Sequence, residues 1–262
     1  AATAIAMGDW LHPWRLGRGH DDADRRPTHL LLDGGRLCVP DAAAGRFLNA
    51  YAIAVVQQRR PCVVELRTPV FRLFMDLDIK TAAGAALDVD AAVRVIQGRV
   101  AAFFDVEQPR CVVCVSPPAA LDDGAVKQGR HLHWPDVRVA PATALALREL
   151  VVGDLDLALP GACSRPWQDV VDACVFKGSG LRMPWSFKGR DGTAAYEPVQ
   201  DWRGAEPQDV RVPADNAAEL RPWVRLLSIR ATVDAEETPV RAGVELPVPE
   251  TNDELGHGGC RS

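Results

Sequence analysis

The chain has 262 residues, of which 47% are hydrophobic and 25% are charged, and its net charge is −5. These proportions are typical of a globular protein, and the length predicts one large domain or two closely packed lobes. Its apolar runs are shorter than the roughly 18 residues that a transmembrane helix requires. This excludes a helical membrane channel or transporter, and we expect no membrane partner.

The predicted elements alternate between helices and strands. Asp41 is a helix-capping residue type, and the Ala-rich stretch after it places its large side chains on one side, so a helix is predicted over residues 41–58. Runs of β-branched and aromatic residues predict strands over residues 62–66 and 71–78. Further helices are predicted over residues 88–104, 141–152 and 215–227, and further strands over residues 110–116, 129–139 and 170–176. The alternation indicates an α/β or α+β fold with a central sheet.

The distribution of charge and the number of cysteines indicate which partners and which cellular compartment to expect. Residues 125–190 carry nine basic and six acidic side chains, whereas residues 191–262 carry seven basic and 14 acidic ones. The negative net charge therefore comes from the C-terminal part, and the local charge does not argue against a nucleic-acid partner. The chain has seven cysteines and is too long to need disulfides for stability, so we expect a reducing intracellular compartment.

Two of the cysteines, Cys111 and Cys114, have the spacing of half a zinc site. They lie in a β-branched run, and residues three apart on a strand point to opposite faces of the sheet. No second pair of ligands follows at the spacing of a structural zinc site. We therefore predict that both are buried structural cysteines.

One strand-like segment carries two carboxylates among apolar residues. Because side chains alternate between the faces of a strand, Asp76 and Asp78 share one face. Adjacent carboxylates repel each other unless a cation neutralises them, and hard oxygen ligands suit Mg²⁺ or Mn²⁺. The segment indicates either a divalent-metal site or aspartates that face solvent or pair with Arg72 or Lys80.

Two later segments carry cations at regular spacings. His131 and His133 share a strand face with Lys127 upstream, a pattern that suits a metal site but equally two ordinary structural histidines. Farther along, Asp172 leads into a Gly-Ser-Gly turn followed by Arg182 and then Lys188. Glycines permit close backbone approach, and Arg and Lys bind phosphate oxygens, so this segment is either a phosphate-binding turn or a hairpin with solvated basic ends.

Together, and in this order, the three segments resemble the motifs of the archaeo-eukaryotic primase superfamily, in the branch of large DNA viruses and eukaryotic primase-polymerases. The resemblance covers roughly residues 60–232. The family's first motif is hydrophobic-Asp-x-Asp and is matched by Met75 to Asp78. Its second is small-x-His with an upstream lysine and is matched by Lys127, Gly129 and His131. Its third is matched by Asp172 to Phe176 and by Gly180 to Arg182, with Lys188 farther along the chain. Gly129 stands where a serine is common, which removes one hydroxyl able to bind phosphate.

The resemblance implies template-directed nucleotidyl transfer by a DNA primase or primase-polymerase, in DNA replication or damage tolerance. Asp76, Asp78 and Asp172 would be the catalytic carboxylates and would hold two Mg²⁺ or Mn²⁺ ions. The implied partners are a single-stranded DNA template, a primer and nucleoside triphosphates, with a helicase or other replication proteins as further candidates. The residues implied in nucleotide binding are Lys127, Gly129, His131, Arg182 and Lys188, and those expected on the template surface are Arg138, Arg165 and Trp185.

The resemblance also implies a fold and a location. An N-terminal α/β module, to which residues 1–60 contribute, would pack on an RRM-like sheet, with the active site in the cleft between them. Residues 61–235 would form the catalytic core. Residues 236–262 are rich in Pro, Glu and Gly without periodicity and predict a disordered tail or linker. The expected location is the nucleus or a viral replication compartment.

Two other classes of function remain compatible with the same residues. A metal-dependent nuclease would use the Asp and His cluster to degrade DNA without nucleoside triphosphates. A catalytically inactive nucleic-acid-binding module of a replication complex would bind without turnover. A nucleic-acid product that grows longer only when a metal ion and nucleoside triphosphates are present would distinguish the primase from both.

Overall fold

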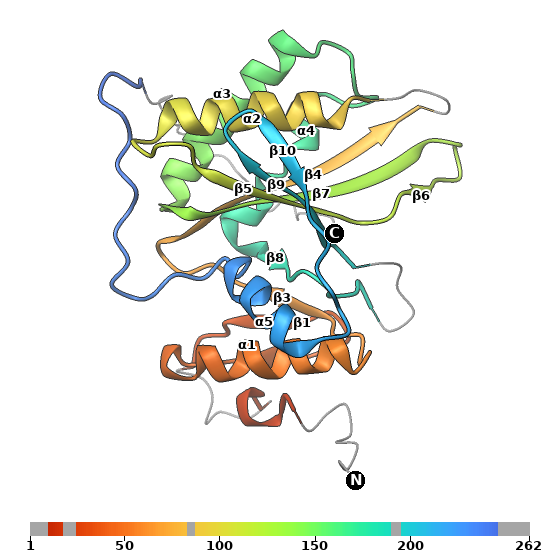
Figure 1. The fold of residues 1–262 in the computed structure, drawn as a ribbon, viewed down its shortest axis with the longest axis vertical. Coiled ribbons are helices and arrows are strands. Elements are labelled where there is room, and N and C mark those ends of the chain that lie inside the picture. The colour runs from red at the N-terminus through yellow and green to blue at the C-terminus, as the bar shows by residue number, and fades with distance from the viewer. Residues whose placement is uncertain (1–9, 18–24, 83–86, 190–194, 246–262) are drawn as a thin grey trace, which may run out of the picture.

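The computed structural model describes residues 10–17, 25–82, 87–189 and 195–245. Over these ranges the chain forms two antiparallel sheets, each with its own helices, stacked as two layers (Figure 1). None of the helices in these ranges is long and apolar enough to cross a membrane. The fold is therefore mixed α/β, as predicted, with antiparallel rather than parallel pairing in the ladders.

The larger layer is a sheet in the order β10-β9-β5-β7-β4, with β6 attached to β7. Helices α2, α3 and α4 lie on one side of it (Figure 1). Its strands are β4 (Phe71–Thr81), β5 (Arg110–Val115), β6 (Ala119–Ala120), β7 (Val126–Val139), β9 (Glu197–Arg203) and β10 (Glu206–Asp209). Its helices are α2 (Val89–Phe103), α3 (Pro141–Ala158) and α4 (Trp167–Val170).

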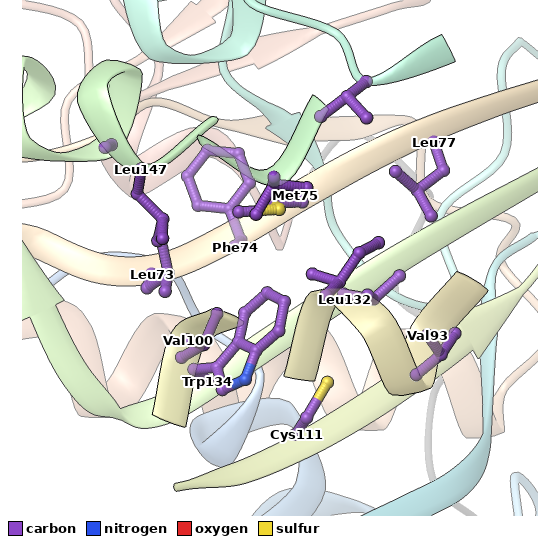
Figure 2. Close-up of a cluster of buried hydrophobic side chains, with 14 of the residues drawn as sticks. Leu73, Phe74, Met75, Leu77, Val93, Val100, Cys111, Leu132, Trp134 and Leu147 are labelled. Atoms are coloured by element: carbon purple, nitrogen blue, oxygen red, sulfur yellow. The ribbon is translucent and has the colours of Figure 1, made fainter. Parts of the chain in front are cut away.

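Strand alternation explains how this layer builds its core. Leu73, Met75 and Leu77 project from β4 toward the helices and are fully buried (Figure 2). Trp134 of β7 lies in the same cluster, where its indole N–H donates a 2.7 Å hydrogen bond to the Gln97 side chain of α2. Burying each of these large side chains contributes about 1.5–3 kcal/mol. On the opposite face of β4, Phe74 is buried against Phe176, and the polar side chains of Asp76 and Asp78 follow at alternate positions.

The smaller layer brings together segments that are far apart in the sequence. Its sheet has the order β2-β1-β3-β8, so strands from the N-terminal part pair with one from the third motif region. Helices α1 and α5 pack beside each other against it (Figure 1). The elements are β1 (His29–Leu31), β2 (Arg36–Leu37), α1 (Asp41–Val56), β3 (Val63–Glu65), β8 (Leu181–Arg182) and α5 (Ala217–Leu226), with a 3-10 turn at His12–Trp14.

Strand β5 contributes to the cores of both layers. Cys111 belongs to the core of the larger layer, and Cys114 belongs to the core of the smaller one. Both are completely buried, and their thiol pKa values are raised, chiefly by burial. The prediction of buried structural cysteines on opposite faces is confirmed.

Most predicted helices and strands are present, and Asp88 caps α2 by accepting a 2.9 Å hydrogen bond from the Ala91 amide. The predicted strand over residues 170–176 is wrong. Only Val171 pairs, in a single bridge with Leu77, and the chain then turns through a π-helical segment at Val175–Ser179. The cause is the Asp172 carboxylate, which accepts a 2.7 Å hydrogen bond from the Cys174 amide and closes a side-chain turn.

The predicted disordered tail over residues 236–262 is wrong for residues 236–245. Glu237 accepts hydrogen bonds from the Ala140 amide and the Thr143 hydroxyl at the start of α3, at 2.9 and 2.7 Å. Val240 bridges to Phe104 and packs on the core of the larger layer. Tertiary hydrogen bonds order this segment, and periodicity in sequence does not report them. Residues 246–262 lie outside the described residues.

We expect Thr238→Val to lower the melting temperature by roughly 3–6 °C. The Thr238 hydroxyl accepts a 2.8 Å hydrogen bond from the Arg138 amide in a position that is nearly buried. Valine leaves that amide without an acceptor, which costs about 1–2 kcal/mol. Thermal unfolding followed by circular dichroism measures the shift. The control is Thr232→Val at an exposed position, and equal melting temperatures for the two variants would contradict the assignment.

Candidate active site

The polar face of the larger sheet is organised by the pairing of β4 with β7. In this ladder Asp76 lies opposite His131, and Asp78 lies opposite Gly129. Both aspartates are half-buried, while their neighbours on β4 are fully buried on the helix side. The prediction that the two carboxylates share a face is confirmed. The second predicted motif lies directly across from the first because the two strands are antiparallel neighbours.

The third aspartate reaches the same place through the main chain. The Asp172 amide donates a 3.0 Å hydrogen bond to the Asp76 carbonyl, next to the bridge between Val171 and Leu77. This contact holds the turn after α4 against the middle of β4. As a result, carboxylates 96 residues apart in sequence lie close enough for Asp172 to act electrostatically on Asp76.

The carboxylates differ in how their charge is balanced. Asp78 is paired with Lys127, whose Nζ lies 2.8 Å from Asp78 Oδ1. Asp76 has no ion pair with a lysine or arginine among the described residues, and His131 Nε2 lies 3.7 Å from its Oδ1. Burial, then the carboxylates of Asp172 and Asp78, raise the pKa of Asp76 to about 7. The site therefore holds more negative charge than its own cations neutralise.

The histidines of the second motif are buried and are held neutral. Burial, with His133 and Arg182 nearby, lowers the pKa of His131 well below its usual value. Burial lowers the pKa of His133 to about 4. Their rings are 6.1 Å apart, and among the described residues neither His131 Nδ1 nor His133 Nε2 has a hydrogen-bond partner. His131 lies beside Asp76, whereas His133 lies two residue pairs farther along the ladder, opposite Phe74.

Arg182 approaches the site from the smaller layer. It lies on β8, paired with Val64 of β3, and its guanidinium carbon is 4.6 Å from the centre of the Tyr196 ring. The same tyrosine stacks on His131, with ring centres 3.5 Å apart and 19° between the ring planes. Tyr196 thus connects two of the predicted nucleotide-binding residues. Burial and the nearby Asp76 raise the pKa of the Tyr196 phenol, which keeps it protonated.

Some predicted residues lie elsewhere. Lys188 is exposed and makes no hydrogen bond or ion pair within the ranges that the structure describes, so its role in nucleotide binding stays a prediction. Trp185 is 3% exposed and belongs to the core of the smaller layer. The prediction that it offers a stacking surface to the template is wrong, because nearly all of the side chain is buried in that core. Arg165 is half-buried, with its guanidinium 3.6 Å from the Asp169 carboxylate, while Arg138 is an exposed residue on β7.

The donor set fits hard divalent cations. Carboxylate oxygens are the ligands that Mg²⁺ and Mn²⁺ prefer, and the raised pKa of Asp76 reflects a need for positive charge at this position. Within the described ranges, no three Asp, Glu, His or Cys side chains converge as a metal centre as they stand. Asp78 is turned to Lys127, and Asp172 is turned to the Cys174 amide.

One residue of this site was not found from the sequence. Tyr196 lies outside the three motifs, directly before β9. It approaches His131 because β9 is the neighbour of β5 in the sheet. Nothing in the local sequence around it predicts that position. The signal that points to it is the glycine at position 129, where the family commonly has a serine. The absence of a side chain there leaves room that another residue can fill.

The stabilisation that the metal-free protein gains from binding a proton at Asp76 is expected to fall as pH rises from about 4 to about 7, whereas the lowered pKa values of His131 and His133 give contributions of the opposite sign. Because the folded protein raises the pKa of Asp76 from 3.8 to about 7, the folded state binds this proton more tightly than the unfolded chain. This stabilisation is fully present at pH values below the pKa of Asp76 in the unfolded chain, and it is lost as pH rises through the pKa of Asp76 in the folded protein. The difference in melting temperature in EDTA between the unmodified protein and a variant that lacks this proton measures the contribution, because the histidines contribute equally to both proteins.

The matched control for this pH dependence is Asp76→Asn, which carries no titrating proton at that position. The melting temperature of the unmodified protein should fall relative to that of this variant as pH rises over the same range, and Mn²⁺ should raise the melting temperature of the unmodified protein most at the higher pH. Identical pH profiles for the two proteins would contradict the assigned environment of Asp76.

A sequence model of one protein family, described as the C962R protein N-terminal AEP domain, matches residues 28–201 of the chain. The match extends from β1 into β9 and so contains all three predicted motifs. No curated protein was found to match.

Proposed function

The chain belongs to the archaeo-eukaryotic primase superfamily, in its viral branch, and on that premise we propose that it is a DNA primase or primase-polymerase. The family is one of primase-like nucleotidyltransferases. The proposed reaction joins a nucleoside triphosphate to the 3′-hydroxyl of a primer or of an initiating nucleotide and releases pyrophosphate. The proposed partners are a single-stranded DNA template, a primer and nucleoside triphosphates, and the proposed setting is DNA replication in the nucleus or a viral replication compartment.

The observation that carries this proposal is the pairing of carboxylates with cations across one sheet face. Asp76 and Asp78 on β4 face the second motif on β7, and the Asp172 backbone is hydrogen-bonded to Asp76. Lys127 and Arg182 bring positive charge to the edges of this carboxylate group. A site with acidic and basic sides suits metal ions on one side and the triphosphate that they bind on the other.

The roles of the residues follow from this arrangement. Asp76, Asp78 and Asp172 would hold two Mg²⁺ or Mn²⁺ ions, which when bound lower the pKa of an attacking hydroxyl and neutralise phosphate oxygens. Lys127 and Arg182 would bind the triphosphate and place fixed positive charge where negative charge develops in the transition state. The neutral His131 would contact a phosphate oxygen as a hydrogen-bond donor. Lys188, in the segment after β8, would also bind the triphosphate.

The proposed architecture has two further parts. The sheet order β5-β7-β4 continues beyond β4 in the Val171 bridge, and α2 and α3 cover one face. This order supports the proposal that the larger sheet is RRM-like. Arg182 from the smaller layer and the aspartates of the larger one are close enough to interact. That proximity supports an active site between the layers.

The proposal is tested by incubating the protein with a primed single-stranded DNA template, labelled deoxynucleoside triphosphates and Mg²⁺ or Mn²⁺. Extension of the primer that requires the metal and follows the template sequence is expected. A parallel reaction with an unprimed template and labelled ribonucleoside triphosphates tests initiation. Shortening of the DNA without triphosphates would indicate a nuclease, and triphosphate binding without product would indicate an inactive binding module. Either result would contradict the proposal.

A further inference from the structure

Gly129 leaves a space that is occupied by a tyrosine hydroxyl. A Cβ atom built on Gly129 would lie 2.0 Å from Tyr196 Oη and 2.7 Å from Cζ of the same ring. Both distances are far below any real carbon contact, so no side chain fits at position 129 while Tyr196 stays in place. The phenol oxygen therefore lies directly over the Gly129 Cα, where a serine side chain at that position would begin.

The surroundings of this oxygen are those of the proposed triphosphate site. Gly129 is the cross-strand partner of Asp78, and the Tyr196 ring stacks on His131. Asp76, Asp78 and Arg182 all lie close enough to the phenol to act on it electrostatically. The tyrosine is 5% exposed, so its position is fixed by packing before any ligand binds.

We propose that Tyr196 is a nucleotide-binding residue and that its hydroxyl donates to a triphosphate oxygen the hydrogen bond that the glycine at position 129 cannot supply. A phenol held over the β4–β7 ladder replaces a serine hydroxyl carried by β7. The ring gives this donor a rigid support, because it packs against His131 on the same face of the sheet. The inference rests on the proposed function, since it names a further residue of the same site.

The first test is Tyr196→Phe, which removes the hydroxyl and keeps the ring. Binding of a non-hydrolysable α,β-imido deoxynucleoside triphosphate with Mn²⁺ is measured by isothermal titration calorimetry. We expect binding to weaken by roughly 10-fold, the effect of losing one hydrogen bond to a charged group. The matched control is Tyr51→Phe, which removes a hydroxyl that donates to the Pro184 carbonyl in the smaller layer. It should lower the melting temperature and leave triphosphate affinity unchanged.

The second test exchanges the two hydroxyl positions. Gly129→Ser alone should bind the triphosphate poorly, because its Cβ clashes with Tyr196. Tyr196→Leu removes both the ring and the hydroxyl and should also bind poorly. Combining Gly129→Ser with Tyr196→Leu removes the clash with Tyr196 and returns a hydroxyl from β7. The new Cβ would still lie 2.9 Å from Ser116 Oγ, which a rotation of the Ser116 side chain relieves. The double variant should therefore bind several-fold more tightly than Tyr196→Leu.

A third comparison separates direct binding from an effect through Arg182, which contacts the same ring. If the Tyr196 hydroxyl donates directly, adding Tyr196→Phe to Arg182→Gln should weaken triphosphate binding further. Equal triphosphate affinities of Arg182→Gln and the variant with both of these changes would overturn direct donation. Equal affinities of Tyr196→Phe and the unmodified protein would also overturn it, as would a folded double variant no tighter than Tyr196→Leu. If the unmodified protein binds no triphosphate and extends no primer, the proposed function itself fails.

Discussion

Replacing Asp76 with asparagine is expected to lower metal-dependent nucleotide addition by roughly 10³-fold, because the loss of one carboxylate removes several kcal/mol of charge stabilisation by the metal. Asp78→Asn and Asp172→Asn should each have a similar effect. The three carboxylates would act as a unit, so the double variants should lose little more than the single ones. Primer extension under single-turnover conditions measures each loss.

The structure also predicts how these variants differ in stability. Asp76→Asn replaces a carboxylate whose ionisation is opposed by burial and by its two acidic neighbours, so the metal-free variant should be at least as stable as the unmodified protein. The control is Asp156→Asn on the exposed side of α3, which should retain full activity. Near-normal synthesis by a folded variant at position 76, 78 or 172 would remove that residue from the proposed metal site.

Replacing Arg182 with glutamine is expected to weaken nucleoside triphosphate binding by about 10- to 100-fold, the range for losing hydrogen bonds to a charged group. Arg182 interacts with the Tyr196 ring and acts electrostatically on Asp76 from the smaller layer. Affinity for single-stranded DNA without triphosphate should change much less. Calorimetry with the α,β-imido analogue and fluorescence anisotropy with labelled DNA measure the two affinities.

The matched control for Arg182 is Arg203→Gln, which makes the same chemical change at an exposed position on β9. Both affinities should remain as in the unmodified protein. If Arg182→Gln instead abolished DNA binding and left triphosphate affinity intact, Arg182 would be assigned to the template, and the proposed triphosphate position would have to move.

Strand periodicity was sufficient to predict the first half of the candidate site. A hydrophobic strand with carboxylates at alternate positions presents them on one face whatever its partners are, and Asp76 and Asp78 do so. The second motif is also on a strand, so His131 and Gly129 could be predicted to share a face. Their exact opposition to the aspartates depends on the register of β4 with β7. A single sequence does not contain that register.

The parts that could not be predicted depend on contacts between distant segments. Tyr196 enters the site through the pairing of β9 with β5, and Arg182 enters it through the pairing of β8 with β3. The segment around Thr238 is ordered by hydrogen bonds to β7 and α3 rather than by its own composition. Trp185 resembles an exposed aromatic in sequence, but it is needed to fill the core of the smaller layer.

The most direct test of the proposed site is a crystal structure of the protein with Mn²⁺ and the α,β-imido deoxynucleoside triphosphate. The anomalous signal of manganese should lie at the carboxylates of Asp76, Asp78 and Asp172, with the triphosphate extending toward Lys127 and Arg182. Manganese or triphosphate bound away from this face of β4, under conditions in which the protein extends a primer, would contradict it.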